Sequence, residues 1–329
     1  MRRALGIICL LVGLLTAAGG YYAYRFHGDL ASATVLVAFA LLMIPYFALG
    51  FDSIIDALRT MGRSNRFRLA AMGFLLLAPG TLMMAIAADS ASFLHNMLVL
   101  ALYVTVPIII LAGLGGGQRR PTALDLLALL ALWLPVELQY FEKLWLLPDG
   151  NPSYVLAKTL GMELAVFCFV VVRRLDGVGY RFRLAGEDFT IGFVALIVFL
   201  AVGIPTALGT GFVEFEPSWS GLGNWLLMSL AIFFFIALPE EVLFRGLIFN
   251  MLQRYIKVGG PYTALVISSF IFGLAHLNNP PGDWRYVILA TAAGMCYGWA
   301  YLRSGSLLAA AYAHAMVDII GRTIFPHPS

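Results

Sequence analysis

The sequence has few charged residues, and this shortage excludes an ordinary soluble protein. Charged residues make up 12% of the 329 residues and hydrophobic residues make up 61%. A soluble domain has about 25% charged and about 45–50% apolar residues. A soluble protein of this length would not have enough charged groups to cover its surface. The lipid bilayer is therefore the predicted solvent.

Cysteines and clustered basic residues are also scarce. The three cysteines, Cys9, Cys168 and Cys296, each lie in an apolar stretch. An odd number of widely spaced cysteines argues against a disulfide framework or a zinc cage, so we interpret all three as small buried side chains. The net charge of +3 includes no basic cluster interleaved with aromatic residues. The sequence therefore predicts no nucleic-acid partner.

Long apolar runs, in contrast, fill most of the chain. Runs of about 17 to 25 apolar residues can cross a roughly 30 Å hydrocarbon core as helices. The sequence therefore predicts an all-α fold, a polytopic transmembrane helix bundle with about eleven spans. The predicted spans are residues 4–23, 31–51, 69–88, 93–114, 122–139, 154–172, 189–208, 225–250, 261–277, 286–302 and 306–325. The first of them can also be interpreted as a cleavable signal peptide.

Basic residues are distributed unevenly among the connections between these spans. If the N-terminus is cytoplasmic, most of the 21 Lys and Arg residues fall in connections on the cytoplasmic side. An excess of Lys and Arg is typical of cytoplasmic loops. We therefore predict an integral membrane protein with the N-terminus in the cytoplasm and the C-terminus outside. We take the membrane to be a prokaryotic plasma membrane, although the charge pattern alone does not identify it.

Ionisable side chains inside membrane spans are costly, and three of them lie together in the span over 225–250. Glu241 and Arg245 are four residues apart, so they share a helix face and can form an ion pair. Glu240 points about 100° away from them and has no local partner. A carboxylate in a dry site is suited to act as a general base for water. A structural ion-pair cluster that fixes helix packing is the alternative.

Two later spans each contribute a histidine. His276 lies four residues after Phe272 near the end of its span, and His314 lies four residues before Asp318. The carboxylate of Asp318 could orient the imidazole of His314, help to bind a metal, or support an oxyanion site. Each pair alone also fits a structural hydrogen bond. One shared polar site accounts for all of them together, because intramembrane ionisable groups usually converge at a functional site.

The order of these motifs resembles the CAAX-prenyl-protease and bacteriocin-processing family of intramembrane endopeptidases. Three short patterns carry the resemblance: Glu-Glu-x-x-x-Arg over 240–245, Phe-x-x-x-His over 272–276 and His-x-x-x-Asp over 314–318. Many members have Asn at the last position, where this sequence has Asp318. The resemblance covers about residues 225–322.

The resemblance implies an enzyme that hydrolyses a peptide bond in a membrane-associated or lipid-modified protein or peptide. It implies that Glu240 activates the attacking water and that His276 helps to position this water. Glu241 and Arg245 would brace the site, and His314 with Asp318 would stabilise the oxyanion. We accordingly predict transmembrane helices of unassigned role over 1–220 and a CAAX-protease-like catalytic core over 221–325.

The cofactor stays open at this point. Two histidines and a carboxylate could bind zinc, but the HExxH spacing typical of zinc proteases is absent. Members of the family are described both as metalloproteases and as metal-free glutamate proteases. The sequence is compatible with either chemistry.

Two other functions are alternatives to a protease. A secondary transporter or channel would use the buried Glu and His side chains to bind ions or relay protons. Such a protein should have repeats and polar groups in both halves, whereas here the polar groups concentrate in one third of the chain. A non-proteolytic membrane scaffold or immunity protein is the second alternative, and the intact motifs argue against it. The predicted partners are a membrane-associated protein or peptide substrate and the lipid bilayer.

Overall fold

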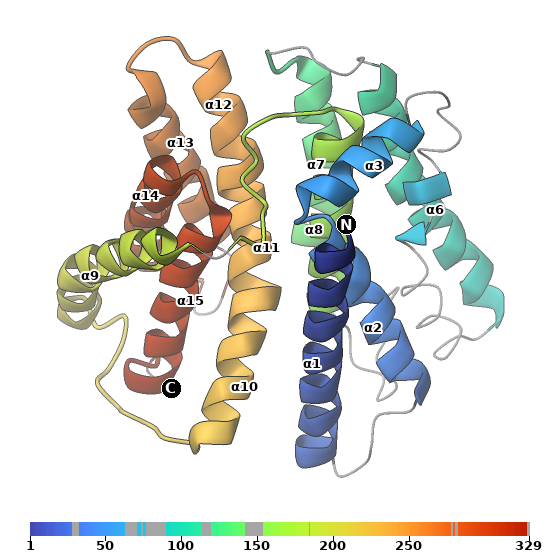
Figure 1. Ribbon diagram of the computed structural model, residues 1–329. Helices are drawn as coiled ribbons and strands as arrows, with labels where there is room; N and C mark the ends of the chain where they lie inside the picture. Colours follow the sequence, from blue (N-terminus) through green and yellow to red (C-terminus); the bar gives the residue numbers. More distant parts are fainter. Residues whose placement is uncertain are drawn as a thin grey trace. The chain divides into compact units, whose positions relative to one another are not determined.

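The described residues of the computed structural model are mostly helical (Figure 1). Within the residues it describes there is no strand, which confirms the predicted all-α fold. The chain divides into two compact units, Met1–Asp176 and Gly177–Ser329, and each is considered by itself. The described residues are 1–27, 33–62, 71–73, 75–76, 90–113, 120–141, 154–183, 185–277, 279 and 282–327.

The first unit is a bundle of apolar helices. Its packing pairs α1 with α2 and α6 with α7, and α8 contacts both α2 and α7. The last turns of α8 widen into the π-helical segment η1. Among the described residues, the helices of this unit are α1 (Arg2–His27), α2 (Ala33–Ala48), α3 (Asp52–Gly62), α6 (Ser90–Gly113), α7 (Ala123–Glu137), α8 (Tyr154–Val166) and η1 (Phe167–Val172).

A buried ion pair joins the start of α7 to the residue that follows η1 in this first unit. The guanidinium of Arg173 donates to Asp125 through Nε at 2.6 Å and Nη2 at 3.2 Å. Both side chains are almost completely buried. Asp125 also lies in the first turn of α7, where its carboxylate accepts a hydrogen bond from the backbone N–H of Thr122. The side chain of Thr122 in turn caps the helix. One carboxylate therefore caps α7 and neutralises the arginine that follows η1.

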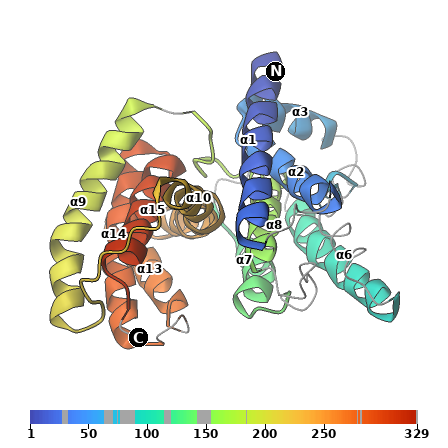
Figure 2. The same ribbon diagram turned by 90° about the horizontal axis from the view of Figure 1, so that it is seen from below.

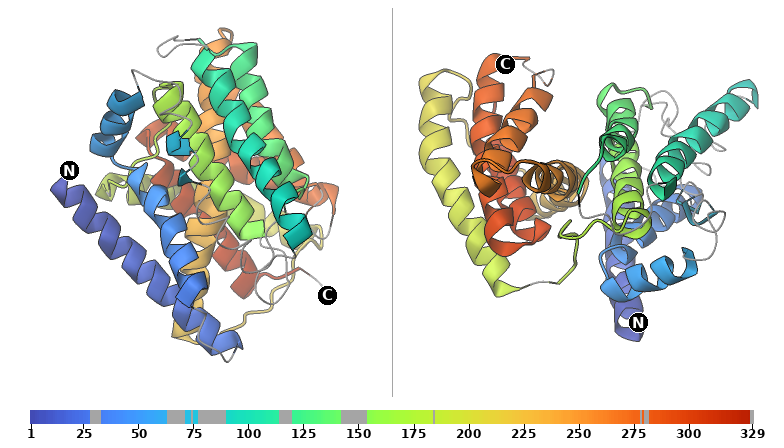
Figure 3. Two further views of the ribbon diagram at one scale, coloured as in Figure 1. Left: turned by 90° about the vertical axis from the view of Figure 1, so that its right-hand side faces the viewer. Right: turned by 90° about the horizontal axis from the view of Figure 1, so that it is seen from above.

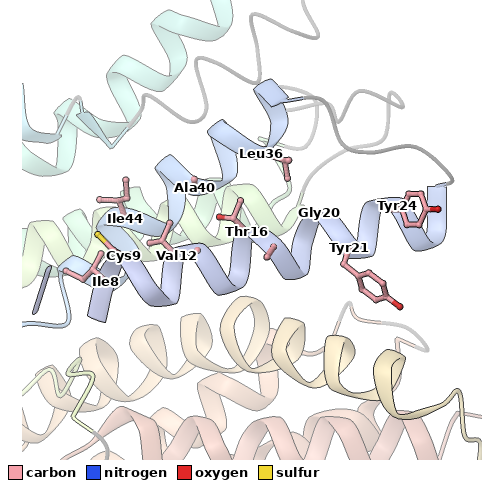
Figure 4. Close-up of a pocket in the computed structure, with 12 residues that line it drawn as sticks. Ile8, Cys9, Val12, Thr16, Gly20, Tyr21, Tyr24, Leu36, Ala40 and Ile44 are labelled. Carbon is pink, nitrogen blue, oxygen red and sulfur yellow. The ribbon is translucent and has the colours of Figure 1, made fainter. Parts of the chain in front are cut away.

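An apolar groove of about 780 Å³ runs between α1 and α2 (Figure 4). Small residues such as Gly13 and Ala40 line it together with larger aliphatic side chains. Cys9 lies in this groove and is exposed, and Cys296 is half-buried, so the prediction that all three cysteines are buried is confirmed only for Cys168. An exposed apolar face is expected where lipid rather than water is the solvent.

The second unit is built around one long helix and several shorter ones. The long helix comprises α10 (Leu222–Ile232), η2 (Phe233–Ala237), α11 (Leu238–Glu241), η3 (Val242–Phe249) and α12 (Asn250–Tyr255). The remaining helices of the unit are α9 (Gly186–Gly209), α13 (Gly260–Ala275), α14 (Trp284–Ser304) and α15 (Leu307–Ile324). Packing of α9 against α14 and α15 is visible in Figures 2 and 3.

The central helix of this unit is α15, which contacts α9, α14 and the long helix. Its buried face consists largely of alanines between Ala309 and Ala315. Small side chains let helix backbones approach closely in a membrane. The same reason applies to Gly192 of α9, because a Cβ atom there would lie 2.6 Å from the carbonyl oxygen of Ala309.

The long helix is irregular where its carboxylates lie. Pro239 has no backbone N–H, so it cannot continue the ordinary hydrogen-bond pattern of an α-helix. The preceding residue, Leu238, donates to the carbonyl of Phe233, five residues earlier, which is the π-helical pattern. Widened turns of this kind often occur at functional sites. Here they flank the turn that carries Glu240 and Glu241.

The predicted number of eleven spans is not confirmed. Five helices in the described part of the chain are long and apolar enough to cross a membrane, or six if the pair Val35–Ala48 and Asp52–Gly62, bent by 92°, is one span. Other predicted spans coincide with helices that are short, such as α7 with 15 residues and α13 with 16. The predicted span over 69–88 lies mostly outside the described residues.

The division at residue 220 stays a prediction. Helix α9, which precedes residue 220, packs against α14 and α15 within the same compact unit as residues 221–325. The six predicted site residues also lie within this unit.

Candidate active site

The six predicted site residues come from three parts of the second unit. The turn α11 carries Glu240 and Glu241, and Arg245 follows on η3. His276 is the residue that ends α13, and His314 and Asp318 lie on α15. The structure brings the side chains from these helices together, and the distances below join their polar atoms.

Glu241 is the carboxylate at the centre of the cluster. Its side chain is fully buried, and its Oε1 accepts from Nη1 of Arg245 at 2.9 Å. The same oxygen accepts from Nδ1 of His314 at 2.8 Å. The ion pair predicted from the four-residue spacing of Glu241 and Arg245 is therefore confirmed. Glu241 also connects the long helix to α15.

Arg245 connects the long helix to α14. Its Nη2 donates to the carbonyl oxygen of Gly294 at 2.9 Å. Its guanidinium lies 4.5 Å from the ring centre of Phe272, a cation–π contact. Gly294 allows this approach, because a Cβ atom there would lie 3.1 Å from Nη2 of Arg245 and 3.1 Å from the Phe272 ring. The arginine is thus held by a charge, a carbonyl and an aromatic face.

Glu240 faces the two imidazoles. Its Oε2 lies 4.0 Å from Nε2 of His276 and 3.7 Å from Nε2 of His314. These separations exceed direct hydrogen bonds, which end near 3.5 Å, and suit groups that share a water. The side chain of Glu240 is 15% exposed, whereas that of Glu241 is fully buried. The two adjacent carboxylates therefore have different environments.

The hydrogen bond of His276 Nδ1 determines which ring nitrogen of His276 carries the proton. Nδ1 lies 2.8 Å from the carbonyl oxygen of Phe272. A carbonyl can only accept a hydrogen bond, so Nδ1 carries a proton. In the neutral ring, Nε2 is then an acceptor, and it points at another acceptor, the carboxylate of Glu240. A water molecule is the group that can donate to both.

His314 is oriented by Glu241 rather than by Asp318. Its Nδ1 donates to Glu241, whereas its Nε2 lies 3.8 Å from Oδ1 of Asp318, too far for a hydrogen bond. Of the roles considered for Asp318, the structure therefore lacks a direct hydrogen bond to this imidazole, and the other roles stay predictions. Asp318 and Glu240 instead both face Nε2 of His314. A doubly protonated ring would have carboxylate oxygens near both of its nitrogens.

Aromatic rings hold the imidazoles in place. Tyr297 stacks on His314, with ring centres 4.8 Å apart and planes within 13°. Phe272 packs edge-on against His314 and lies 4.5 Å from the ring of His276. Tyr286 also contacts His276, at 5.0 Å between ring centres. Tyr286, Tyr297 and Gly294 are not among the six site residues predicted from the sequence.

A cavity of about 600 Å³ lies next to the cluster. From the predicted site, His276, His314 and Asp318 line it. Apolar side chains of α9, including Phe199, and the residues that follow α15 complete its wall. A cavity of this size, mostly apolar with a few polar groups on one side, is typical of a ligand site.

A metal site can be sought among the same residues. In the part of the chain that the structure describes, no group of three or more His, Cys, Asp or Glu side chains is arranged to hold a metal ion. The two histidines each use Nδ1 for a protein hydrogen bond, to Phe272 and to Glu241. Their Nε2 atoms are the ones that face Glu240.

Comparison with known protein families gives a match that falls on this unit. Residues 222–320 match the family model described as type II CAAX prenyl endopeptidase Rce1-like. This stretch, less than half of the chain, is similar to the Rce1-like family. The match begins at α10 and includes all six site residues. No curated protein and no solved structure matches the chain.

The Rce1-like match and the apolar helices agree on the broad class of protein. The match supports a CAAX-type intramembrane endopeptidase, because the family is a protease family. The long apolar helices support an integral membrane protein. Residues 1–221 lie outside the match and have no assigned role.

Proposed function

We propose that the protein hydrolyses a peptide bond in a membrane-associated, prenylated protein or peptide, and that Glu240 activates the attacking water. The observation that carries this proposal is the arrangement of Glu240 with His276 and His314. One carboxylate oxygen faces two imidazole nitrogens at 4.0 and 3.7 Å. The match to a family named for CAAX prenyl endopeptidases supports the class of substrate.

The hydrogen-bonding capacity around Glu240 suits an attacking water. A water that donates one O–H to Oε2 of Glu240 and the other to Nε2 of His276 keeps its lone pairs directed away from both. The lone pairs of such a water can then point at the carbonyl carbon of a bound peptide, which is the orientation needed for attack. As attack proceeds, Glu240 accepts a proton and can later donate it to the leaving amine.

His314 is the group proposed to stabilise the developing oxyanion. Its Nδ1 bond to Glu241 fixes the ring, and stacking against Tyr297 fixes its plane. When Nε2 carries a proton, it donates toward the cavity, where the carbonyl oxygen would lie. Asp318 has only acceptor oxygens when ionised, so we assign it to supporting the charged His314 ring rather than to contacting the oxyanion.

Glu241 and Arg245 are positioning residues in this proposal. They are too deeply buried to contact a substrate in the cavity, with side chains 0% and 1% exposed. Their role is to hold His314 from one side and the α14 backbone from the other. A substrate in the cavity therefore meets the two histidines, and Glu240 lies within 4.0 Å of both of them, while the buried pair maintains their geometry.

The test uses the full-length protein in detergent or liposomes with a prenylated reporter peptide that ends in a CAAX sequence. The purified protein should release one C-terminal fragment, identified by mass spectrometry. Glu240→Gln should abolish release, because an amide cannot take up the proton from water. Glu187→Gln, an exposed glutamate in the first turn of α9, is the matched control and should leave release unchanged.

Metal analysis of the wild-type protein and the Glu240→Gln variant belongs to the same experiment. It distinguishes loss of a general base from loss of a bound metal. Cleavage that survives Glu240→Gln at the wild-type rate would contradict the proposed mechanism. Absence of cleavage by the wild-type protein across CAAX reporters that differ in prenyl group and sequence would contradict the proposed substrate class.

A further inference from the structure

The cavity beside the candidate active site extends past the six site residues to the end of α15. Its wall there includes Arg322, Phe325, Pro326 and His327. Arg322 is the only Lys or Arg among the described residues that line this cavity. The proposed chemistry does not use this arginine.

Arg322 stands apart from the other arginines near the site in its bonding. Arg245 bonds to Glu241 and Gly294, and Arg285 bonds to Asp283 and to the carbonyl of Thr210. Within the described residues the guanidinium of Arg322 has no such hydrogen bond or ion pair. It interacts with Asp318 only at longer range, through their charges. Its donors are therefore available to a molecule in the cavity.

The position of Arg322 is fixed by the backbone around it. The backbone carbonyls of residues 323, 324 and 326 accept hydrogen bonds from a connecting segment over 214–218. Ser218 N–H donates to Thr323 O at 2.8 Å, Glu216 N–H to Ile324 O at 3.0 Å, and Glu214 N–H to Pro326 O at 3.0 Å. These three bonds hold the end of α15 next to the cavity, so Arg322 projects from a secured helix terminus.

The distance from the site to Arg322 matches a short peptide. Arg322 follows His314 by eight residues, which is about 12 Å along a helix at 1.5 Å per residue. An extended peptide covers about 3.3 Å per residue, so three residues cover about 10 Å. A CAAX sequence ends three residues after its prenylated cysteine. If hydrolysis occurs directly after that cysteine, the C-terminal carboxylate lies close to Arg322.

The chemistry of the two groups also matches. An arginine guanidinium presents a planar set of donors that fits a carboxylate with two parallel hydrogen bonds. Arg322 is an exposed residue at the edge of the cavity, so the pair is moderate in strength and contributes mainly selectivity. Asp318, one helical turn away, would repel a carboxylate placed next to the catalytic groups. A carboxylate is therefore favoured only at the Arg322 end of the cavity.

We propose that Arg322 binds the C-terminal carboxylate of the substrate and thereby favours substrates whose C-terminus is a free acid. This inference rests on the proposed function, because it takes the scissile bond to lie at Glu240. It makes Arg322 a specificity-determining residue and leaves the bond-breaking step to the site residues already described.

The test compares two prenylated peptides that differ only at the C-terminus, one with a free carboxylate and one with an amide. The wild-type protein should cleave the acid roughly 2- to 5-fold faster in kcat/KM, the range for an ion pair that involves an exposed side chain. Arg322→Gln should reduce this preference to near one by slowing only the acid. Arg303→Gln is the matched control, since Arg303 is also exposed in the last turn of its helix but lies outside the cavity.

A second peptide series moves the carboxylate. One residue added after the CAAX sequence shifts it by about 3.3 Å and should lower kcat/KM for the wild-type protein. The same addition should have little effect on Arg322→Gln. Unchanged cleavage of the amide peptide by Arg322→Gln shows that the variant is folded. A preference for the acid that persists in Arg322→Gln would overturn the inference.

A binding measurement separates this inference from the proposed function. The free-acid and amide forms of the product tripeptide are titrated against the wild-type protein and Arg322→Gln. Tighter binding of the acid to the wild-type protein alone supports the role of Arg322 even if no peptide is cleaved. Equal binding of acid and amide to the wild-type protein overturns it, whether or not Glu240-dependent cleavage is observed.

Discussion

Replacing Arg245 with methionine should destabilise the protein strongly. Methionine keeps much of the apolar length of the side chain, so the change removes mainly the charge and the hydrogen bonds. Glu241 would then lie fully buried without its cation, since the two side chains are 0% and 1% exposed in the pair. Removing one partner of a buried ion pair costs about 3–5 kcal/mol. The bond to Gly294 is lost as well.

The size of this effect has an internal check in a double-mutant cycle. Glu241→Gln removes the charge that Arg245→Met leaves unpaired, and the amide oxygen can still accept from His314. The double variant should therefore be less destabilised than the sum of the two single variants, with a coupling of about 0.5–3 kcal/mol. Arg303→Met, at an exposed position, is the control and should change stability by less than about 0.5 kcal/mol.

The assay is unfolding in mixed detergent micelles, followed by tryptophan fluorescence and by protease sensitivity. Both probes report on the fold without requiring a substrate. Arg245→Met with stability within about 1 kcal/mol of the wild-type protein would refute the reasoning that Arg245 neutralises a buried carboxylate. Strictly additive effects of the two single variants would refute the assigned coupling between Glu241 and Arg245.

Two further predictions concern α14. Gly294→Ala should lower both stability and cleavage rate, because the added Cβ would lie 3.1 Å from the site arginine and 3.1 Å from Phe272; normal activity of this variant would show that the contact is not required. Asp283 caps the N-terminus of α14, and its carboxylate accepts hydrogen bonds from the side chain and backbone of Arg285. These bonds lower the pKa of Asp283. Its stabilising effect should be complete above the unfolded pKa of about 4 and should be lost as the pH falls through the lower folded value. Thermal unfolding of the wild-type protein and Asp283→Asn should therefore converge at low pH, and a constant difference would contradict this assignment.

Part of the candidate site could be predicted because it depends on helical spacing alone. Glu241 and Arg245 lie on one face of a helix by their separation of four residues, and the structure has that ion pair. The separation of Glu240 from this pair also follows from helix geometry. The structure turns Glu240 toward two histidines from other helices.

Other parts of the site depend on how helices pack, which spacing does not determine. His314 and Asp318 have the spacing of a bonded pair, but the carboxylate that reaches His314 is Glu241 from the long helix. Gly294 and Tyr297 come from α14, which contributes none of the six predicted residues. Gly294 matters because it has no side chain, which leaves room for Arg245. The sequence alone does not show this, because it does not show that Arg245 packs against Gly294.

The span count was less predictable than the fold class. Composition and run length identify apolar helices, and the helices over 123–137 and 260–275 are present where spans were expected. These helices are about 15 residues long, and a helix needs about 20 residues to cross the hydrocarbon core. Apolar content does not distinguish a full crossing from a shorter helix packed inside the bundle.

The measurement that tests the central claim most directly is kcat/KM of the wild-type protein and of Glu240→Gln on one prenylated CAAX peptide, at equal amounts of folded protein. The account predicts a loss of about 10²- to 10⁴-fold, the range for removing a general base, with an unfolding transition close to that of the wild-type protein. A Glu240→Gln variant that cleaves the peptide as fast as the wild-type protein would contradict the assignment of water activation to Glu240.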